Sequence, residues 1–100
     1  MMRIISRKTL REFWELPNYA NSEQPLKAWY DEAAKANWET PNEIKAQYKS
    51  ASVLKGGRVV FNIHGNRYRL VVKINYDFGV IYIRFVGTHE AYDKINVEEV

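Results

Sequence analysis

The chain has 100 residues, of which 46% are hydrophobic and 14% aromatic, and its formal net charge is +3. This length and apolar content predict a single folded domain over residues 1–100 rather than a disordered chain. With no cysteine and two histidines, disulfide scaffolds, thiolate zinc sites, cysteine nucleophiles and all-histidine metal cages are excluded. No apolar run approaches the roughly 18 residues that cross a bilayer, and the N-terminus lacks the apolar stretch of a signal peptide. We therefore expect a cytoplasmic protein with no membrane partner.

The first helix is expected after a short strand at Arg3–Ile5. It should start at Ser6 or Thr9, because Thr9 and Glu12 have the spacing of a capping box. Pro17 should end it.

Two further helices are expected. The second should begin at Ser22, because apolar residues then recur at i, i+3, i+4 and i+7 and mark one buried stripe. These residues are Leu26, Trp29, Tyr30 and Ala33. The third has the clearest start signal of the chain, with Thr40 as cap, Pro41 at the first helical position and Glu43 at the third, and should run to about Tyr48.

The second half of the chain has the pattern of an antiparallel meander followed by a short helix. The expected strands are Arg58–Ile63, Arg67–Tyr76 and Val80–Val86. A two-residue turn at Gly65-Asn66 and a turn at Asp77–Gly79 join them, and Thr88 can cap a last helix to about Lys94. The predicted order, β-α-α-α-β-β-β-α, is the α+β class, with helices packed on one face of an antiparallel sheet.

Positive charge is concentrated in one stretch. Between Glu43 and Asp77 there is no acidic residue, but there are seven basic ones. They are Lys45, Lys49, Lys55, Arg58, Arg67, Arg69 and Lys73. Strand alternation places Arg67, Arg69 and Lys73 on one face. Protection of an edge strand explains one or two such charges, whereas three favour a surface that binds nucleic-acid phosphates.

The following strand adds Arg84 to the same face. The residues expected to face the core from this strand are Ile81, Ile83 and Phe85. Arg84 should then lie on the other face, near Arg69 or Val71. Two neighbouring guanidiniums repel unless an anion lies between them, which predicts a phosphate clamp. The alternative is that each arginine pairs with a carboxylate such as Asp77 or Asp93.

His89 and Tyr92 are candidate proton-transfer groups. They are three residues apart and share a helix face, with Asp93 one turn after His89. Both side chains can move protons, and His89 directly follows the strand that carries Arg84. The alternative is that His89 only occupies a first helical turn while Tyr92 packs on the sheet. His89 and Asp93 alone do not complete a metal site, so we predict no metal and no cofactor.

The large aromatic residues are assigned to the core rather than to a stacking surface. They are Trp14, Trp29, Phe61 and Phe85. Trp38 is left unassigned, and His64 is expected to be exposed at the tip of the hairpin.

Two blocks of this sequence resemble the HigB toxins, bacterial type II toxin–antitoxin proteins with the RelE-like fold. Phe61–Leu70 contains F-N-I-x-G-N-x-Y-R-L, and Gly87–Lys94 contains G-T-H-x-x-Y-D-K. Arg11–Trp14 and Leu26–Tyr30 are similar to the helical half of the family. The resemblance therefore covers nearly the whole chain.

The resemblance implies an endoribonuclease that cuts mRNA, often on the translating ribosome, by metal-independent attack of the ribose 2′-OH on the adjacent phosphate. It implies that Arg69 and Arg84 hold the phosphate and that His89 and Tyr92 move protons or support the base. The residues expected to bind the rest of the substrate are Asn66, Arg67, Lys73 and Lys94.

The same resemblance implies a partner, a HigA-type helix-turn-helix antitoxin. Operator DNA would be contacted only through that antitoxin. Two other functions stay open at this point: a ParE-like inhibitor of gyrase that does not cut RNA, and an RNA-binding module without cleavage.

Overall fold

Five strands form one mixed sheet in the computed structural model, which describes all residues, 1–100. The strands are β1 (Arg3–Ile5), β2 (Ser52–Val53), β3 (Arg58–Ile63), β4 (Tyr68–Asn75) and β5 (Val80–Thr88). Their order across the sheet is β1-β5-β4-β3-β2. β1 pairs with β5 in parallel, and the other pairs are antiparallel. The meander β3-β4-β5 was predicted; β2 and the parallel pairing of β1 were not.

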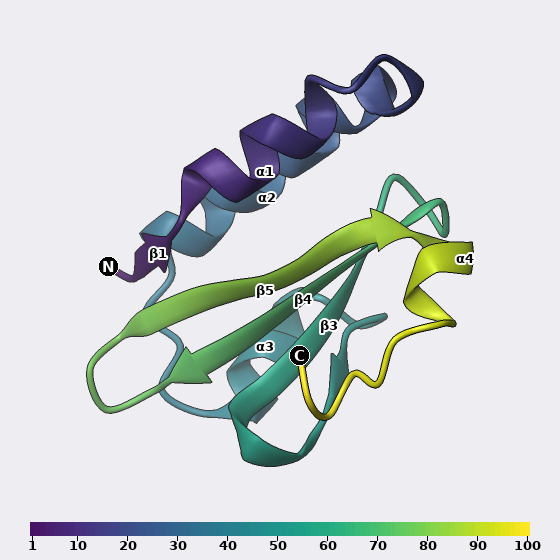
Figure 1. Cartoon of the computed structure of the whole chain (residues 1–100). Coiled ribbons are helices and arrows are strands. Elements are labelled where there is room, and N and C mark those ends of the chain that lie inside the picture. The colour runs from purple at the N-terminus through teal and green to yellow at the C-terminus, as the bar shows by residue number, and fades with distance from the viewer.

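Helices cover one face of this sheet (Figure 1). They are α1 (Arg7–Trp14), α2 (Glu23–Lys35) and α3 (Pro41–Gln47), while the short α4 (His89–Tyr92) follows β5 at one end. Two 3₁₀ segments, η1 (Pro17–Ser22) and η2 (Lys55–Gly57), complete the chain. The order confirms the predicted α+β class, with β2 as an additional strand.

Side-chain caps account for the starts of α3 and α4. At α3, Glu43 Oε1 accepts the backbone N–H of Thr40 at 3.0 Å, which forms the expected capping box. α1 begins earlier than a cap at Thr9 would allow, because Ser6 occupies the capping position. At α4, Thr88 Oγ1 accepts the backbone N–H of Ala91 at 3.0 Å, as predicted.

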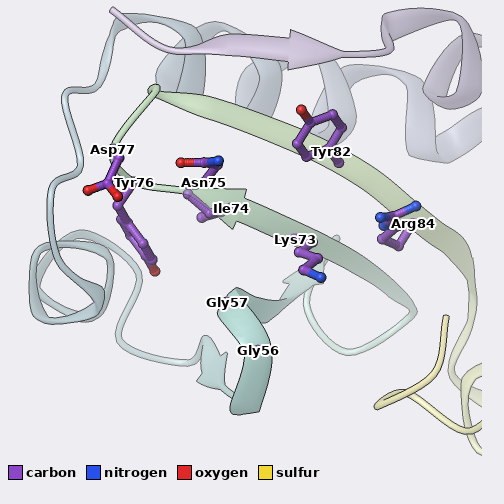
Figure 2. A pocket seen from close by; sticks show the side chains of 9 residues that line it. All are labelled: Gly56, Gly57, Lys73, Ile74, Asn75, Tyr76, Asp77, Tyr82 and Arg84. Atoms are coloured by element: carbon purple, nitrogen blue, oxygen red, sulfur yellow. The ribbon is translucent and has the colours of Figure 1, made fainter.

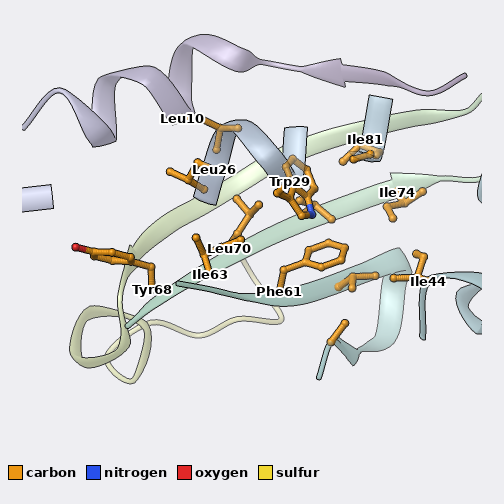
Figure 3. Packing of buried hydrophobic residues seen from close by; sticks show 14 of the residues in the cluster. Leu10, Leu26, Trp29, Ile44, Phe61, Ile63, Tyr68, Leu70, Ile74 and Ile81 are labelled. Atoms are coloured by element: carbon orange, nitrogen blue, oxygen red, sulfur yellow. The ribbon is translucent and has the colours of Figure 1, made fainter. Parts of the chain in front are cut away.

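The helical stripe and the inner sheet face make one core (Figure 3). Trp29 of α2 packs against Phe61 of β3 with ring centroids 5.3 Å apart. Trp14, Trp29 and Phe61 are buried as predicted. Trp38 is buried too, and its indole N–H donates to Gln47 Oε1 at 3.1 Å.

The β3–β4 hairpin turns at Gly65 and Asn66, but its connection has four residues, 64–67, and not the predicted two. The backbone N–H of Arg67 donates to the carbonyl of His64 at 3.3 Å, and His64 is exposed. Strand pairing starts with Ile63 opposite Tyr68. Arg67 therefore belongs to the turn and not to the basic face of β4.

A β-bulge at Arg84 reverses the side-chain alternation of β5. Val72 pairs with Ile83 and Val71 pairs with Phe85, so that Arg84 is the extra residue between them. Phe85 consequently lies on the face opposite the core, together with Val71. The prediction of Phe85 as a core residue is wrong, because it assumed unbroken alternation along the strand.

We call the face opposite the helices the outer face. One end of it carries Arg58, Lys73, Tyr82 and Arg84, the middle Val60, Val71 and Phe85, and the other end Arg69 and Gly87. The segment after α4 crosses this side of the sheet (Figure 1), where the carbonyl of Val100 accepts Nε and Nη2 of Arg58 at 3.1 and 2.9 Å.

Candidate active site on the outer face

No Asp or Glu side chain pairs with the cations of the acid-free stretch, although Arg58 donates to Val100 at the end of the chain. The three ion pairs of the chain are Lys8–Glu12, Lys27–Glu23 and His89–Asp93. The alternative in which Arg69 and Arg84 pair with Asp77 or Asp93 is therefore not what the structure shows. Unpaired cations on one sheet face produce a positive field that attracts phosphates.

The first hollow of the outer face, of about 510 Å³, contains Arg84 and Lys73 (Figure 2). The bulge supplies Arg84, whose guanidinium carbon lies 5.8 Å from the centre of the Tyr82 ring. The register places Lys73 beside Tyr82 on one side and Arg58 on the other. Tyr76 also lines this hollow, and burial raises the pKa of its hydroxyl, which has no hydrogen-bond partner in the chain. That hydroxyl is buried and stays neutral.

A second hollow, of about 500 Å³, contains His89, Asn66 and Arg67 at the opposite end of the sheet, where η1 of the helical side also lines it. The backbone N–H of His89 donates to the carbonyl of Arg67 at 3.1 Å, which ties the start of α4 to the hairpin. Nδ1 of the half-exposed His89 lies 3.4 Å from Oδ2 of Asp93. With Nδ1 held there, Nε2 is the ring nitrogen left to exchange a proton.

Phe85 lies on β5 between these two hollows and packs near Tyr92. Its ring centre lies 6.5 Å from that of Tyr92, and it also covers Gly87, where a Cβ would come within 2.6 Å of Phe85 Cζ. A side chain at Gly87 would thus displace the ring. The bulge therefore places an aromatic support under α4.

The structure divides the predicted site residues between these places. Lys73 and Arg84 share the first hollow, and Asn66, Arg67 and His89 share the second. Arg69 lies opposite Gly87, and its Nη1 donates to the carbonyl of Asn66 at 3.0 Å. Lys94 lines neither hollow.

Arg69 and Arg84 therefore do not line one common hollow. Along β5, Phe85 lies between Arg84 and Gly87, which is the residue opposite Arg69. The roles assigned to these arginines and to the other site residues stay predictions.

Three further residues join the site that sequence reasoning did not single out. Tyr82, Asn75 and Asp77 line the first hollow. Alternation did place Tyr82 and Asn75 on the basic face, but an isolated tyrosine in a strand is typical of ordinary sheet packing. These residues come together because of the register of β4 with β5, which cannot be read from the sequence.

The chain contains no cluster of three or more histidine, aspartate or glutamate side chains arranged to bind a metal ion. None of its helices has the length and apolar character needed to cross a membrane.

Known proteins match this chain over most of its length. The model of the HigB toxin family, described as the RelE-like toxic component of a toxin–antitoxin system, matches residues 22–95. The mRNA interferase toxin HigB of Escherichia coli strain K12 is 32% identical over 94 residues, which cover 92% of this chain and 88% of that protein. Proteins named mRNA interferase HigB from Escherichia coli O157:H7 and Shigella flexneri match to the same extent. With the α+β fold and these matches together, the chain belongs to the HigB family of RelE-like toxins.

Proposed function

We propose that this chain is an mRNA interferase, an endoribonuclease toxin that acts in the cytoplasm and is neutralised by a cognate antitoxin. The relatives bear the name mRNA interferase. The observation that carries the proposal is the set of outer-face cations without Asp or Glu partners on β4 and β5, together with α4, which directly follows β5 and carries His89 and Tyr92. A surface of this kind binds and polarises phosphates.

The chemistry fitted to these residues is attack by the ribose 2′-OH on the adjacent phosphorus. A bond forms between the 2′ oxygen and phosphorus, and the bond from phosphorus to the 5′ oxygen breaks. The products are a 2′,3′-cyclic phosphate and a 5′-OH end. In this proposal Arg69 and Arg84 approach the phosphate from the two sides of Phe85 and stabilise the negative charge that grows on its oxygens.

Proton transfer is assigned to the α4 end of the site. His89 takes the proton of the 2′-OH or delivers one to the leaving 5′ oxygen, and its contact with Asp93 orients the ring. Tyr92 is held against Phe85 and serves as the second proton-moving group. Asn66, Arg67, Lys73 and Lys94 guide the flanking RNA backbone.

The proposed partners follow from the charge of the surface. A HigA-type helix-turn-helix antitoxin that presents acidic side chains would cover the outer face and exclude RNA, and operator DNA would be reached only through it. The mRNA would be met on the ribosome, where the transcript is single-stranded and extended.

The test is induced expression in a bacterial host, with 5′ ends of mRNA mapped within minutes. The wild-type chain is expected to create new 5′-OH ends inside coding regions, and His89→Asn is expected to abolish them. His64→Asn is the matched control, because His64 is exposed at the hairpin tip and lines neither hollow. Asparagine also tolerates the φ of 55° at that position.

Two outcomes would reject parts of this proposal. Growth arrest without new 5′ ends would remove the enzyme and favour an inhibitor of gyrase. New ends with both histidine variants would keep the enzyme but take the proton-transfer role away from His89.

A further inference from the structure

The hollow beside Arg84 has features that phosphate binding alone does not require. We propose that it is a nucleobase site, in which one unpaired base of the RNA stacks on Tyr82 while the adjoining phosphate lies on Lys73 and Arg84. This inference rests on the proposed function, since it names how the same surface selects its substrate.

The aromatic ring is available for stacking. Tyr82 is 37% exposed, although it lies within the sheet between Lys73 on β4 and Ile5 on β1. Its hydroxyl has no hydrogen-bond partner in the chain, and the guanidinium of Arg84 lies 5.8 Å from the ring centre. Exposed aromatic faces and arginine planes are the surfaces on which proteins stack unpaired bases.

The charges of the hollow give a bound nucleotide a direction. Lys73 and Arg84 lie at one end, and Asn75 and Asp77 lie at the other (Figure 2). A phosphate is drawn to the cationic end and repelled by the carboxylate of Asp77. The base must then extend from the phosphate toward Asn75.

Asn75 is fixed in an orientation that suits a base edge. Its Oδ1 accepts the backbone N–H of Phe78 at 3.1 Å, which leaves the amide NH₂ group without a partner in the chain. This NH₂ group can donate to a ring nitrogen or carbonyl of a base.

Gly56 and Gly57 form one wall of the hollow and let η2 lie close against β4. Both have positive φ, and a Cβ on Gly57 would lie 2.8 Å from the carbonyl oxygen of Ile74. The resulting space of about 510 Å³ falls in the range of small-ligand sites.

The test measures binding without cleavage. Oligoribonucleotides with 2′-O-methyl groups cannot supply the 2′ nucleophile, so their affinity reports binding alone. An oligomer with bases is compared with an abasic oligomer of the same length and charge. Bases are expected to tighten binding to the wild-type chain about tenfold, from one stacking contact.

Variants of the ring separate stacking from other roles. Tyr82→Phe keeps the aromatic face and should retain the preference for bases, whereas Tyr82→Leu should lose most of it. Phe78→Leu is the control, because Phe78 is 80% exposed and does not line this hollow. Thermal unfolding of each variant verifies that it is folded.

The site is overturned if Tyr82→Leu weakens binding of both oligomers equally, because the ring would then only support Arg84. A Tyr82→Leu chain that keeps the full preference for bases also overturns it. The mapping of 5′ ends in cells distinguishes the two proposals. Cleavage by the wild-type chain with either of these binding results rejects the nucleobase site alone, whereas absent cleavage with a ring-dependent preference rejects only the ribonuclease.

Discussion

Arg84 is the extra residue of the β5 bulge. It is exposed and has no carboxylate partner, so its removal leaves no buried charge behind. We expect Arg84→Ala to lower the rate of RNA cleavage about 100-fold, the effect of removing one charge-stabilising donor. The free energy of unfolding should change by less than about 0.5 kcal/mol.

Cleavage of a fixed RNA substrate and urea unfolding measure these two quantities. Arg11→Ala is the matched control, because Arg11 is an exposed arginine of α1 on the helical side. Equal loss of cleavage in both variants would assign Arg84 no special part and would point to net charge alone.

Tyr48 illustrates a residue that responds to pH through stability and not through the site. Burial, and then a hydrogen bond to Glu32 and the negative charge of that carboxylate, raise the pKa of the Tyr48 hydroxyl. Its folded pKa lies above its unfolded value, so the neutral form is favoured by folding. This contribution is complete below about pH 10 and is lost as the pH rises further.

Urea unfolding at pH 8 and pH 11 checks this expectation. The free energy of unfolding of the wild-type chain should fall more between these pH values than that of Tyr48→Phe, which keeps the ring against Phe61 but cannot ionise. At pH 8 the variant should be less stable by about 1 kcal/mol, because the hydrogen bond to Glu32 is gone. Parallel losses in the two chains would contradict the assignment to Tyr48.

At the scale of elements, local sequence patterns predicted where helices begin and which residues form β3, β4 and β5. They did not predict how the strands pair. Thr40 and Thr88 indicate helix starts, because a capping threonine bonds with residues only three positions along the chain. Alternation located the two faces of β4 correctly. Alternation gave the wrong face for Phe85. A bulge arises from the pairing of two strands, and every residue after the bulge lies on the opposite face from the one that alternation predicts.

The contact between Phe85 and Gly87 provides a test of side-chain packing at the end of β5. A Cβ at Gly87 would lie 2.6 Å from Phe85 Cζ, so Gly87→Ala should destabilise the fold by about 1–3 kcal/mol through overpacking. In a Phe85→Ala background the same change should cost much less, since the ring is absent. Urea unfolding of the four chains of this double-mutant cycle measures the coupling. Additive effects would mean that the Phe85 ring does not contact Gly87.

At the scale of the whole molecule, the candidate site could be predicted in part. The acid-free stretch showed where cations concentrate, and the T-H-x-x-Y pattern located His89 and Tyr92. That Lys73 and Arg84 line one hollow while His89 lines another could not be predicted. It depends on the register of three strands, on the bulge, and on the return of the C-terminal segment to Arg58 over 42 positions of sequence.

The uneven charge of the molecule predicts how RNA binding depends on salt. Five cations are assigned to RNA in the proposed function: Arg67, Arg69, Lys73, Arg84 and Lys94. Each phosphate contact with a single strand contributes a slope of about −0.7 to the plot of log affinity against log salt concentration, so five give about −3.5. The double change Lys73→Gln/Arg84→Gln should reduce the steepness by about 1.4.

The helical side of the molecule supplies the matched control for this slope. Lys8 of α1 and Lys35 of α2 are exposed there, and Lys8→Gln/Lys35→Gln removes the same charge. Titration of 2′-O-methylated RNA at several salt concentrations should give this control the wild-type slope. If both double variants flatten the slope equally, RNA binding depends on the net charge of +3 and not on the cations of the outer face. A change confined to the outer-face pair means that the strand register, and not composition, places the RNA.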